Sequence, residues 1–133
     1  MIVADADVIS YFWLDVARTE VARDARRRDE EWVAPALWRS EFRNVLCQHM
    51  EHRTLSFTDA LQIASRAEAD LEDRTYDVST QAVLRLVDET GHSAYDCEYV
   101  ALAQHLDVQL VTGDTQVADR FPDTAVLLED FVG

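Results

Sequence analysis

The chain contains 133 residues, 48% of them hydrophobic, which is enough to close one substantial core, so we expect residues 1–133 to form a single domain. Twelve basic against twenty-six acidic side chains give a net charge of −14, which excludes a generally basic surface that binds nucleic acid through its phosphates. All twelve basic residues are arginine, and the absence of lysine excludes a Walker phosphate-binding loop and Schiff-base chemistry.

The hydrophobic pattern alternates short strand-like runs with longer helical stretches, which predicts a mostly parallel sheet covered by helices on both faces. In chain order, the first half is expected to contain a strand at Ile2–Ala4, helices over Val8–Trp13 and Thr19–Arg28, a strand at Trp32–Ala34 and a helix over Ala36–His52. The second half is expected to contain a helix over Ser56–Glu72, a strand at Thr75–Val78, helices over Ser79–Glu89 and Ser93–Leu106, a strand at Val108–Thr112, a short helix ending at Arg120 and a strand at Ala125–Leu128. The expected fold is an α/β three-layer sandwich with about five strands.

Neither the cysteines nor the apolar runs point to an exported or membrane protein. Cys47 and Cys97 form no Cys-x-x-Cys pair, and no apolar run approaches the ~18 residues that span a bilayer. The N-terminus shows no signal-peptide core. We therefore expect a cytoplasmic protein without a membrane partner.

Three acidic residues follow predicted strands. Asp5 and Asp7 come directly after Ile2–Ala4, and Asp114 follows the strand that ends at Thr112. The carboxyl ends of parallel strands meet at one edge of a sheet, which is where α/β folds collect functional groups. Each aspartate taken singly is also explained as a helix cap, and for Asp7 or Asp114 alone a cap is the better explanation.

A further acid, Glu41, falls on the row of its helix that is expected to face the core. Leu37, Trp38 and Val45 lie three or four residues away, on the same helix face. A buried carboxylate without a partner costs several kcal/mol, so Glu41 is expected either to pair with an arginine or to bind a cation.

Asp96 repeats this pattern in the first turn of the helix that Ser93 opens, although a first-turn aspartate is also common for its interaction with the helix dipole. Asp5, Glu41, Asp96 and Asp114 are then all expected near an element start on one side of the sheet. Like charges converge in this way only when a divalent cation holds them. Oxygen ligands favour Mg²⁺ or Mn²⁺ over zinc, so these four residues are the predicted metal-ligating and catalytic residues.

Four segments carry these acids or their neighbours: Met1-Ile2-Val3-Ala4-Asp5-Ala6-Asp7, Ser40-Glu41-Phe42-Arg43-Asn44, Ser93-Ala94-Tyr95-Asp96-Cys97 and Leu110-Val111-Thr112-Gly113-Asp114. In order and spacing they resemble the motifs of the PIN domain family, and in particular its VapC toxins. The resemblance implies a metal-dependent ribonuclease, the toxin of a type II toxin–antitoxin module, in which Asp5, Glu41, Asp96 and Asp114 ligate Mg²⁺ or Mn²⁺. It also implies an RNA substrate, products with a 5′-phosphate and a 3′-hydroxyl, a homodimer, and inhibition by a cognate antitoxin.

Neighbouring residues are candidates for supporting roles. Where the family usually has a hydroxyl residue after the first aspartate, followed by asparagine or serine, this chain has Ala6 and Asp7. Asp7 and Thr112 are expected beside the ligating carboxylates, where Asp7 adds negative charge. Arg39 and Arg43 lie one helical turn apart and are candidates for RNA phosphate contacts. The acidic surface suits an antitoxin with a basic segment.

Two other interpretations stay open. The Asp5-x-Asp7 segment also resembles the start of a haloacid-dehalogenase-type phosphatase, in which Asp5 is the nucleophile and Asp7 the general acid. The missing lysine, and the lack of any role for Glu41 or Asp96, argue against that family. A PIN fold that has lost catalysis and acts as a binding module is the remaining alternative, and the retention of all four acids argues against it.

Overall fold

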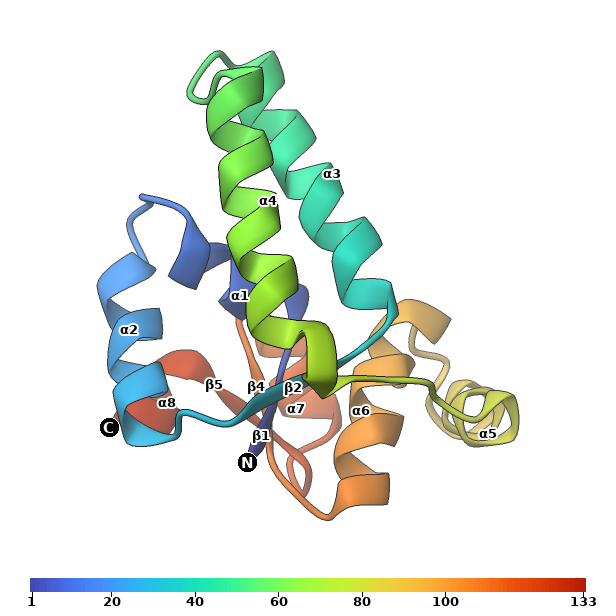
Figure 1. The fold of residues 1–133 in the computed structure, drawn as a ribbon. Coiled ribbons are helices and arrows are strands. Elements are labelled where there is room, and N and C mark those ends of the chain that lie inside the picture. The colour runs from blue at the N-terminus through green and yellow to red at the C-terminus, as the bar shows by residue number, and fades with distance from the viewer.

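The computed structural model describes all 133 residues and contains a central sheet of five parallel strands and eight α-helices (Figure 1). The strands are β1 (Ile2–Ala4), β2 (Trp32–Pro35), β3 (Thr75–Tyr76), β4 (Leu110–Thr112) and β5 (Ala125–Leu127). The helices are α1 (Ala6–Trp13), α2 (Thr19–Arg28), α3 (Leu37–Glu51), α4 (Phe57–Leu71), α5 (Thr80–Thr90), α6 (Ala94–Leu106), α7 (Thr115–Arg120) and α8 (Leu128–Val132), and a 3-10 turn, Glu72–Arg74, precedes β3. The expected α/β architecture is confirmed.

The sheet has the strand order β3-β2-β1-β4-β5, so β1 is its centre. Val3 pairs with Val33 of β2 on one side and with Leu110 of β4 on the other. All three residues of β1 are buried, as is typical of a parallel strand that is covered on both faces. This burial explains why the first residues of the chain are an uninterrupted apolar run.

Helices cover both faces of this sheet. Helix α6 packs against β1, β2 and β4, and α5 packs on α6, while α1, α2 and α8 form a group that contacts β4 from the other side (Figure 1). Helices α3 and α4 pack against each other as a hairpin that projects beyond the sheet (Figure 1). The hairpin is fixed at its base by contacts of both helices with β2.

Side-chain caps define several helix starts, as the sequence suggested. Ser56 and Ser93 accept the backbone N–H groups of the residues three positions later, at 3.1 and 3.2 Å. Gly91 ends α5 with a φ of 69°, the left-handed conformation that glycine adopts without steric cost. The two serines at which helices were expected to begin therefore cap α4 and α6.

Element boundaries differ from the prediction in several places, and β4 for example begins at Leu110 and not at Val108. Helix α1 begins at Ala6 because Asp5 caps it, and β3 is limited to Thr75 and Tyr76. Helix α8 was not predicted, because it follows β5 without a turn residue and the buried Leu128 prolongs the apolar run of the strand. None of the helices has the length and apolar character needed to cross a bilayer.

Candidate functional site

The carboxyl ends of β1 and β4 bring Asp5, Thr112 and Asp114 together. The two strands are neighbours, with Ala4 opposite Val111. Asp5 directly follows β1 and caps α1, and Asp114 caps α7 two residues after β4. The Thr112 hydroxyl donates to Asp5 Oδ2 and accepts the Asp114 N–H at 3.0 Å. A chain of hydrogen bonds therefore links the two aspartates through the threonine that was predicted beside them.

Asp5 is the most enclosed of the acids. Its Oδ1 accepts the Val8 N–H at 2.9 Å, and its Oδ2 accepts the Gly113 N–H at 3.2 Å in addition to the Thr112 hydroxyl. Burial, and after it the charge of Asp7, raises the pKa of Asp5 to about 7, although the three hydrogen bonds act in the opposite direction. The ionised form of Asp5 is therefore costly near neutral pH, and a nearby cation would stabilise it.

A small cavity of about 50 Å³ gathers four acids from separate parts of the chain. Its lining consists of Asp5, Ala6, Asp7, Glu41, Asp96 and Tyr99. We call it the carboxylate cavity. Neither lysine nor arginine contributes to the lining, so no side-chain cation inside it compensates the four negative charges.

Glu41 reaches the carboxylate cavity from α3 and is held there by Tyr99 of α6. The Tyr99 hydroxyl donates to Glu41 Oε1 at 2.6 Å, and the tyrosine is only 3% exposed. Partial burial raises the pKa of Glu41, the Tyr99 hydrogen bond lowers it, and the charges of Asp96 and Asp7 raise it further. Since burial also raises the pKa of Tyr99, the phenol stays protonated and orients the glutamate without neutralising it.

The burial of α3 corrects the sequence prediction for Glu41. The fully buried row of this helix is Trp38, Phe42 and Leu46, whereas Glu41 and Val45 are half-buried. The expectation that Glu41 shares the core row was therefore wrong. Helix α3 packs on α1, α4 and β2 and leaves Glu41, of the neighbouring row, in the lining of the carboxylate cavity, where no arginine pairs with it.

Asp96 is fixed by Ser93, which caps its helix, and by His92, which precedes the cap. The Ser93 hydroxyl accepts the Asp96 N–H at 3.2 Å, and His92 Nε2 lies 2.9 Å from Asp96 Oδ2. The imidazole ring packs edge-on against Phe121, with 5.6 Å between the ring centroids. One carboxylate oxygen of Asp96 is thus held by histidine, and the residue lines the carboxylate cavity.

Asp7 lines the carboxylate cavity, and Asp114 lies beside it, near enough for its charge to act on Asp7. Asp114 is not part of the lining, and its Oδ1 accepts the Gln116 N–H at 2.8 Å. Asp7 is exposed, yet the surrounding protein removes part of its hydration, and this loss raises the pKa of Asp7. The charge of Asp114 raises the pKa further, whereas the charge of Arg18 lowers it. Arg18 is itself bound to Glu129, with Nε and Nη2 at 2.8 and 2.7 Å from the carboxylate oxygens.

The donor set suits a divalent cation of the hard type. The polar side-chain atoms in the cavity lining are all oxygens, which Mg²⁺ and Mn²⁺ prefer. The raised pKa values of Asp5, Asp7 and Glu41 reflect lost hydration and, after it, repulsion between the carboxylates, and the charge of a bound cation would oppose both effects. As arranged, no three Asp, Glu, His or Cys side chains stand close enough together to hold an ion, and Asp5, Glu41 and Asp96 each have a hydrogen-bonding partner of their own. Joint coordination would draw the carboxylates inward from these partners.

The comparison with known families decides where this chain belongs. A family model described as PIN domain matches residues 2–127. The chain belongs to the PIN domain family. This PIN domain is also 30% identical, over 134 residues, to Ribonuclease VapC3 of Pyrobaculum aerophilum, an alignment that covers 91% of this chain and 95% of that protein. The predicted family is confirmed, in preference to the phosphatase interpretation of Asp5 and Asp7.

Solved structures share the fold of this PIN domain. The crystal structure of PAE2754 from Pyrobaculum aerophilum matches with a TM-score of 0.77 at 17% identity, over 98% of this chain and 85% of that one. FitAB bound to an IR36 DNA fragment matches with a TM-score of 0.74 at 17% identity, over 97% of this chain and 96% of that one. FitAcB from Neisseria gonorrhoeae matches with a TM-score of 0.70 at 18% identity, over 96% of each chain. These likenesses confirm the fold class.

Arg39 and Arg43 lie outside the carboxylate cavity of the PIN domain. Both face Glu68 of α4, each at 3.3 Å from its Oε1. They share one face of α3, as their spacing suggested, but this face is turned toward α4, and neither residue contributes to the cavity lining. Their contact with RNA phosphates stays a prediction.

Tyr99 and His92 were missed at the level of the sequence. Tyr99 follows Asp96 by three residues, a spacing that places both on one face of α6, and this was the available signal. His92 precedes the helix, so its contact with Asp96 depends on the turn at Gly91 and on packing against Phe121. No periodicity in the sequence indicates such a contact.

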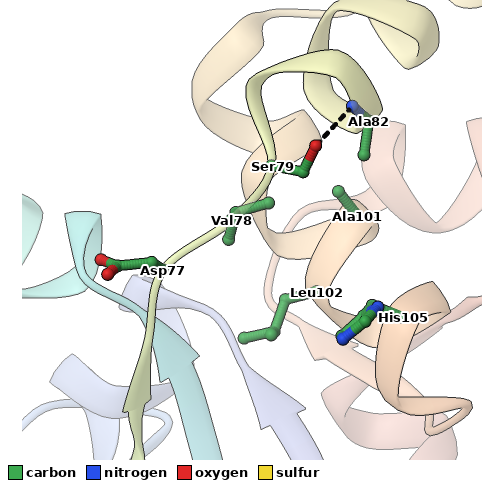
Figure 2. A pocket seen from close by; sticks show the side chains of 7 residues that line it. All are labelled: Asp77, Val78, Ser79, Ala82, Ala101, Leu102 and His105. Atoms are coloured by element: carbon green, nitrogen blue, oxygen red, sulfur yellow. Dashed lines mark hydrogen bonds between the residues drawn. The ribbon is translucent and has the colours of Figure 1, made fainter.

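A second cavity, of about 250 Å³, shares no lining residue with the carboxylate cavity and lies between the segment after β3 and the helices α5 and α6 (Figure 2). Its floor is apolar and includes Val78, Ala101 and Leu102, and the Ser79 hydroxyl is used to cap α5. Figure 2 shows the Asp77 carboxylate directed away from the other lining side chains, and from His105 in particular. This cavity therefore brings no reactive groups together.

Proposed function

We propose that the chain is a metal-dependent endoribonuclease, acting as a single PIN domain and as the toxin of a type II toxin–antitoxin pair. The observation that carries the proposal is the meeting of Asp5, Glu41 and Asp96, from three separate elements, around one small cavity without a lysine or arginine. Membership of the PIN domain family, and the 30% identity to a protein named Ribonuclease VapC3, support the same activity.

In this proposal, Asp5, Glu41 and Asp96 hold Mg²⁺ or Mn²⁺, and Asp114 contributes from beside the carboxylate cavity. Asp7 adds negative charge beside the ligands, which favours binding of the cation. When bound, such an ion supplies activation of a water molecule and stabilisation of the negative charge that develops on the phosphodiester. By resemblance to the family, the products carry a 5′-phosphate and a 3′-hydroxyl.

The chain's own donors orient the three ligating carboxylates. They are a hydroxyl, a phenol and an imidazole, from Thr112, Tyr99 and His92 respectively. The hydroxyl and the phenol carry no charge, so they fix the direction of a carboxylate while leaving its charge available to a cation. An arginine in either place would have oriented the carboxylate and cancelled its charge together.

The proposed partners follow from charge and from the family. RNA is the substrate, and a net charge of −14 repels it at long range until a cation makes the cavity attractive to phosphate. The same acidic surface suits a cognate antitoxin whose basic segment enters the carboxylate cavity and competes with substrate. A homodimer in the cytoplasm is the proposed form of the free toxin.

The decisive experiment is cleavage of labelled RNA by the purified chain with Mg²⁺, Mn²⁺ or EDTA, with a phosphomonoester assayed in parallel. We expect RNA to be cut with either metal and not with EDTA, and Asp96→Asn to abolish the cut. Asp88→Asn removes the same charge on the exposed face of α5 and is the matched control. Hydrolysis of the monoester alone would favour the phosphatase interpretation.

Metal binding tests the assignment of the ligands independently of cleavage. Mn²⁺ is expected to raise the melting temperature of the wild type and of Asp88→Asn, and to leave that of Asp5→Asn unchanged, because a ligand that binds only the folded state stabilises it. Mn²⁺ stabilisation that is equal in all three proteins would contradict the assignment of Asp5 as a ligand.

A further inference from the structure

A larger groove, of about 580 Å³, opens directly beside the carboxylate cavity. The two share three lining residues, Ala6, Asp7 and Glu41, so a molecule in the groove lies next to the carboxylates. We call it the side groove. The rest of its lining comes from one face of α3 and the first turn of α6 and consists of Leu37, Ser40, Asn44, Val45, Gln48 and Tyr95. Its volume lies within the range of about 300–1,000 Å³ that is usual for small-molecule pockets.

One wall of the side groove is a row of neutral polar side chains. Ser40, Asn44 and Gln48 follow one another at intervals of four residues along α3, and all three are exposed. The side-chain hydrogen bonds of α3 are made by other residues, so these hydroxyl and amide groups are available to a ligand. Each amide offers both a donor and an acceptor, the combination that can pair with the edge of a nucleobase.

The side groove also carries an exposed aromatic ring, which comes from α6. Tyr95 is 64% exposed although it directly precedes the half-buried Asp96. Leu37 and Val45, half-buried on α3, add apolar surface to the same groove. Flat apolar surface beside unused hydrogen-bonding groups suits a planar heterocycle better than it suits a phosphate or an aliphatic chain.

The charges of the side groove also favour an uncharged base. Its lining contains no arginine, and its only ionisable acids are Asp7 and Glu41, which it shares with the carboxylate cavity. A phosphate deep in the groove would find no cation, whereas an uncharged base meets no electrostatic penalty. A basic peptide would be drawn to the two shared acids and would leave the amide row unused.

Resting on the proposed ribonuclease activity, we infer that the side groove is a subsite for one unpaired base of the RNA substrate, adjacent to the phosphodiester at the carboxylate cavity. Tyr95 stacks on the base, and the amides of Asn44 and Gln48 contact its edge. A base within a duplex is stacked and has its pairing edge occupied, so it cannot enter. Only a base that is unpaired next to the cleaved phosphodiester can therefore occupy the side groove.

The stacking contact is tested by binding of a short labelled single-stranded RNA, measured by fluorescence anisotropy with Ca²⁺ as the divalent ion. Tyr95→Ala is expected to weaken binding about tenfold, within the range that alanine substitution of stacking aromatics produces. Tyr95→Phe keeps the ring and is expected to bind like the wild type. Phe57→Ala removes an aromatic side chain that is 67% exposed at the start of α4, outside the side groove, and is the matched control.

The edge contact is tested by comparing homopolymers of the four bases. The double variant Asn44→Ala with Gln48→Ala is expected to reduce the spread of affinities among them, because the amides discriminate donors from acceptors. Annealing the RNA to its complement is expected to abolish the difference between the wild type and Tyr95→Ala.

The outcomes separate this inference from the proposed function. Unchanged single-stranded binding by Tyr95→Ala, or equal binding of single strand and duplex by the wild type, overturns the subsite, as does failure of the wild type to bind RNA at all. If the wild type sediments as a dimer and Tyr95→Ala as a monomer, the side groove is a contact between copies of the chain, and the subsite is overturned as well. If the wild type binds single strands through Tyr95 but does not cut RNA with Mg²⁺ or with Mn²⁺, the ribonuclease proposal fails and the subsite stands.

Discussion

Asp5→Asn is expected to change the stability of the metal-free protein in opposite directions at low and high pH. The pKa of Asp5 rises from 3.8 to about 7 on folding, so the folded chain binds an additional proton between those values. The unfolding free energy of the wild type therefore falls as the pH rises through this window, and the loss is complete above about pH 7. Asparagine carries no charge and removes this dependence.

The magnitude follows from the contacts of Asp5. The interval between 3.8 and about 7, at about 1.4 kcal/mol per pH unit, corresponds to about 4 kcal/mol, and the part of the side chain that still meets solvent lowers this to a few kcal/mol. Asparagine offers one oxygen where the carboxylate offers two, so the N–H of Val8 or of Gly113 loses its acceptor, at a cost of about 1–3 kcal/mol. Because little of the pH-dependent loss of the wild type has occurred at about pH 4 and nearly all of it by about pH 8.5, the variant is expected to be less stable than the wild type at the lower pH and more stable at the higher one.

Urea unfolding followed by circular dichroism, in EDTA and at several pH values between these limits, measures the effect. Asp88→Asn makes the same chemical change on the exposed face of α5, away from the carboxylate cavity, and serves as the control. A difference in unfolding free energy between wild type and Asp5→Asn that is the same at both ends of the pH range would show that burial and Asp7 do not act on Asp5 as the structure indicates.

Gly113→Ala is expected to cost about 1–3 kcal/mol of unfolding free energy in urea, because a methyl group there would lie 3.0 Å from the Tyr11 hydroxyl and 3.1 Å from Asp7 Cβ; a neutral effect would contradict this packing. Tyr99→Phe is expected to lower the unfolding free energy by about 1–2 kcal/mol at about pH 8 and by less at about pH 5, because the lost hydrogen bond favours ionised Glu41. A loss of unfolding free energy that is independent of pH would refute that role of Tyr99. Binding of an arginine-rich peptide to the metal-free chain is expected to weaken steeply with added salt, and an affinity indifferent to ionic strength would exclude electrostatic docking.

Much of the fold could be predicted because its signals are local. The buried strand Ile2–Ala4 is an apolar run bounded by Asp5, and the starts of α4 and α6 are marked by serines whose hydroxyls accept a backbone N–H. The strand ends also placed Asp5 and Asp114 correctly, since parallel neighbours deliver their carboxyl ends to one edge of the sheet. The existence of an acidic cluster was therefore accessible from spacing.

The details of the cluster depend on tertiary packing and were not accessible in the same way. Periodicity shows that α3 has an apolar face, but which of two adjacent rows is buried depends on where α1 and α4 pack, and this moved Glu41 from the predicted core to the cavity. The partner of Glu41 is 58 residues away on another helix. The direction of Arg39 and Arg43 was likewise decided by the position of Glu68 on α4.

The pairing of the arginines explains why no arginine neutralises the acids of the carboxylate cavity. Arg18 is bound to Glu129, and Arg26 contacts both carboxylate oxygens of Asp70 at 2.8 and 2.9 Å, while other arginines pair with acids one helical turn away or on α4. These pairs neutralise acids on the outer helices and leave none of the twelve arginines in the lining of the carboxylate cavity or the side groove. Attraction for a phosphodiester then has to come from a bound cation, and attraction for the rest of the nucleotide from neutral contacts. The carboxylate cavity would meet the first requirement and the side groove the second, and the two adjoin through Asp7 and Glu41. An acidic cavity beside a largely uncharged groove is therefore consistent with one substrate.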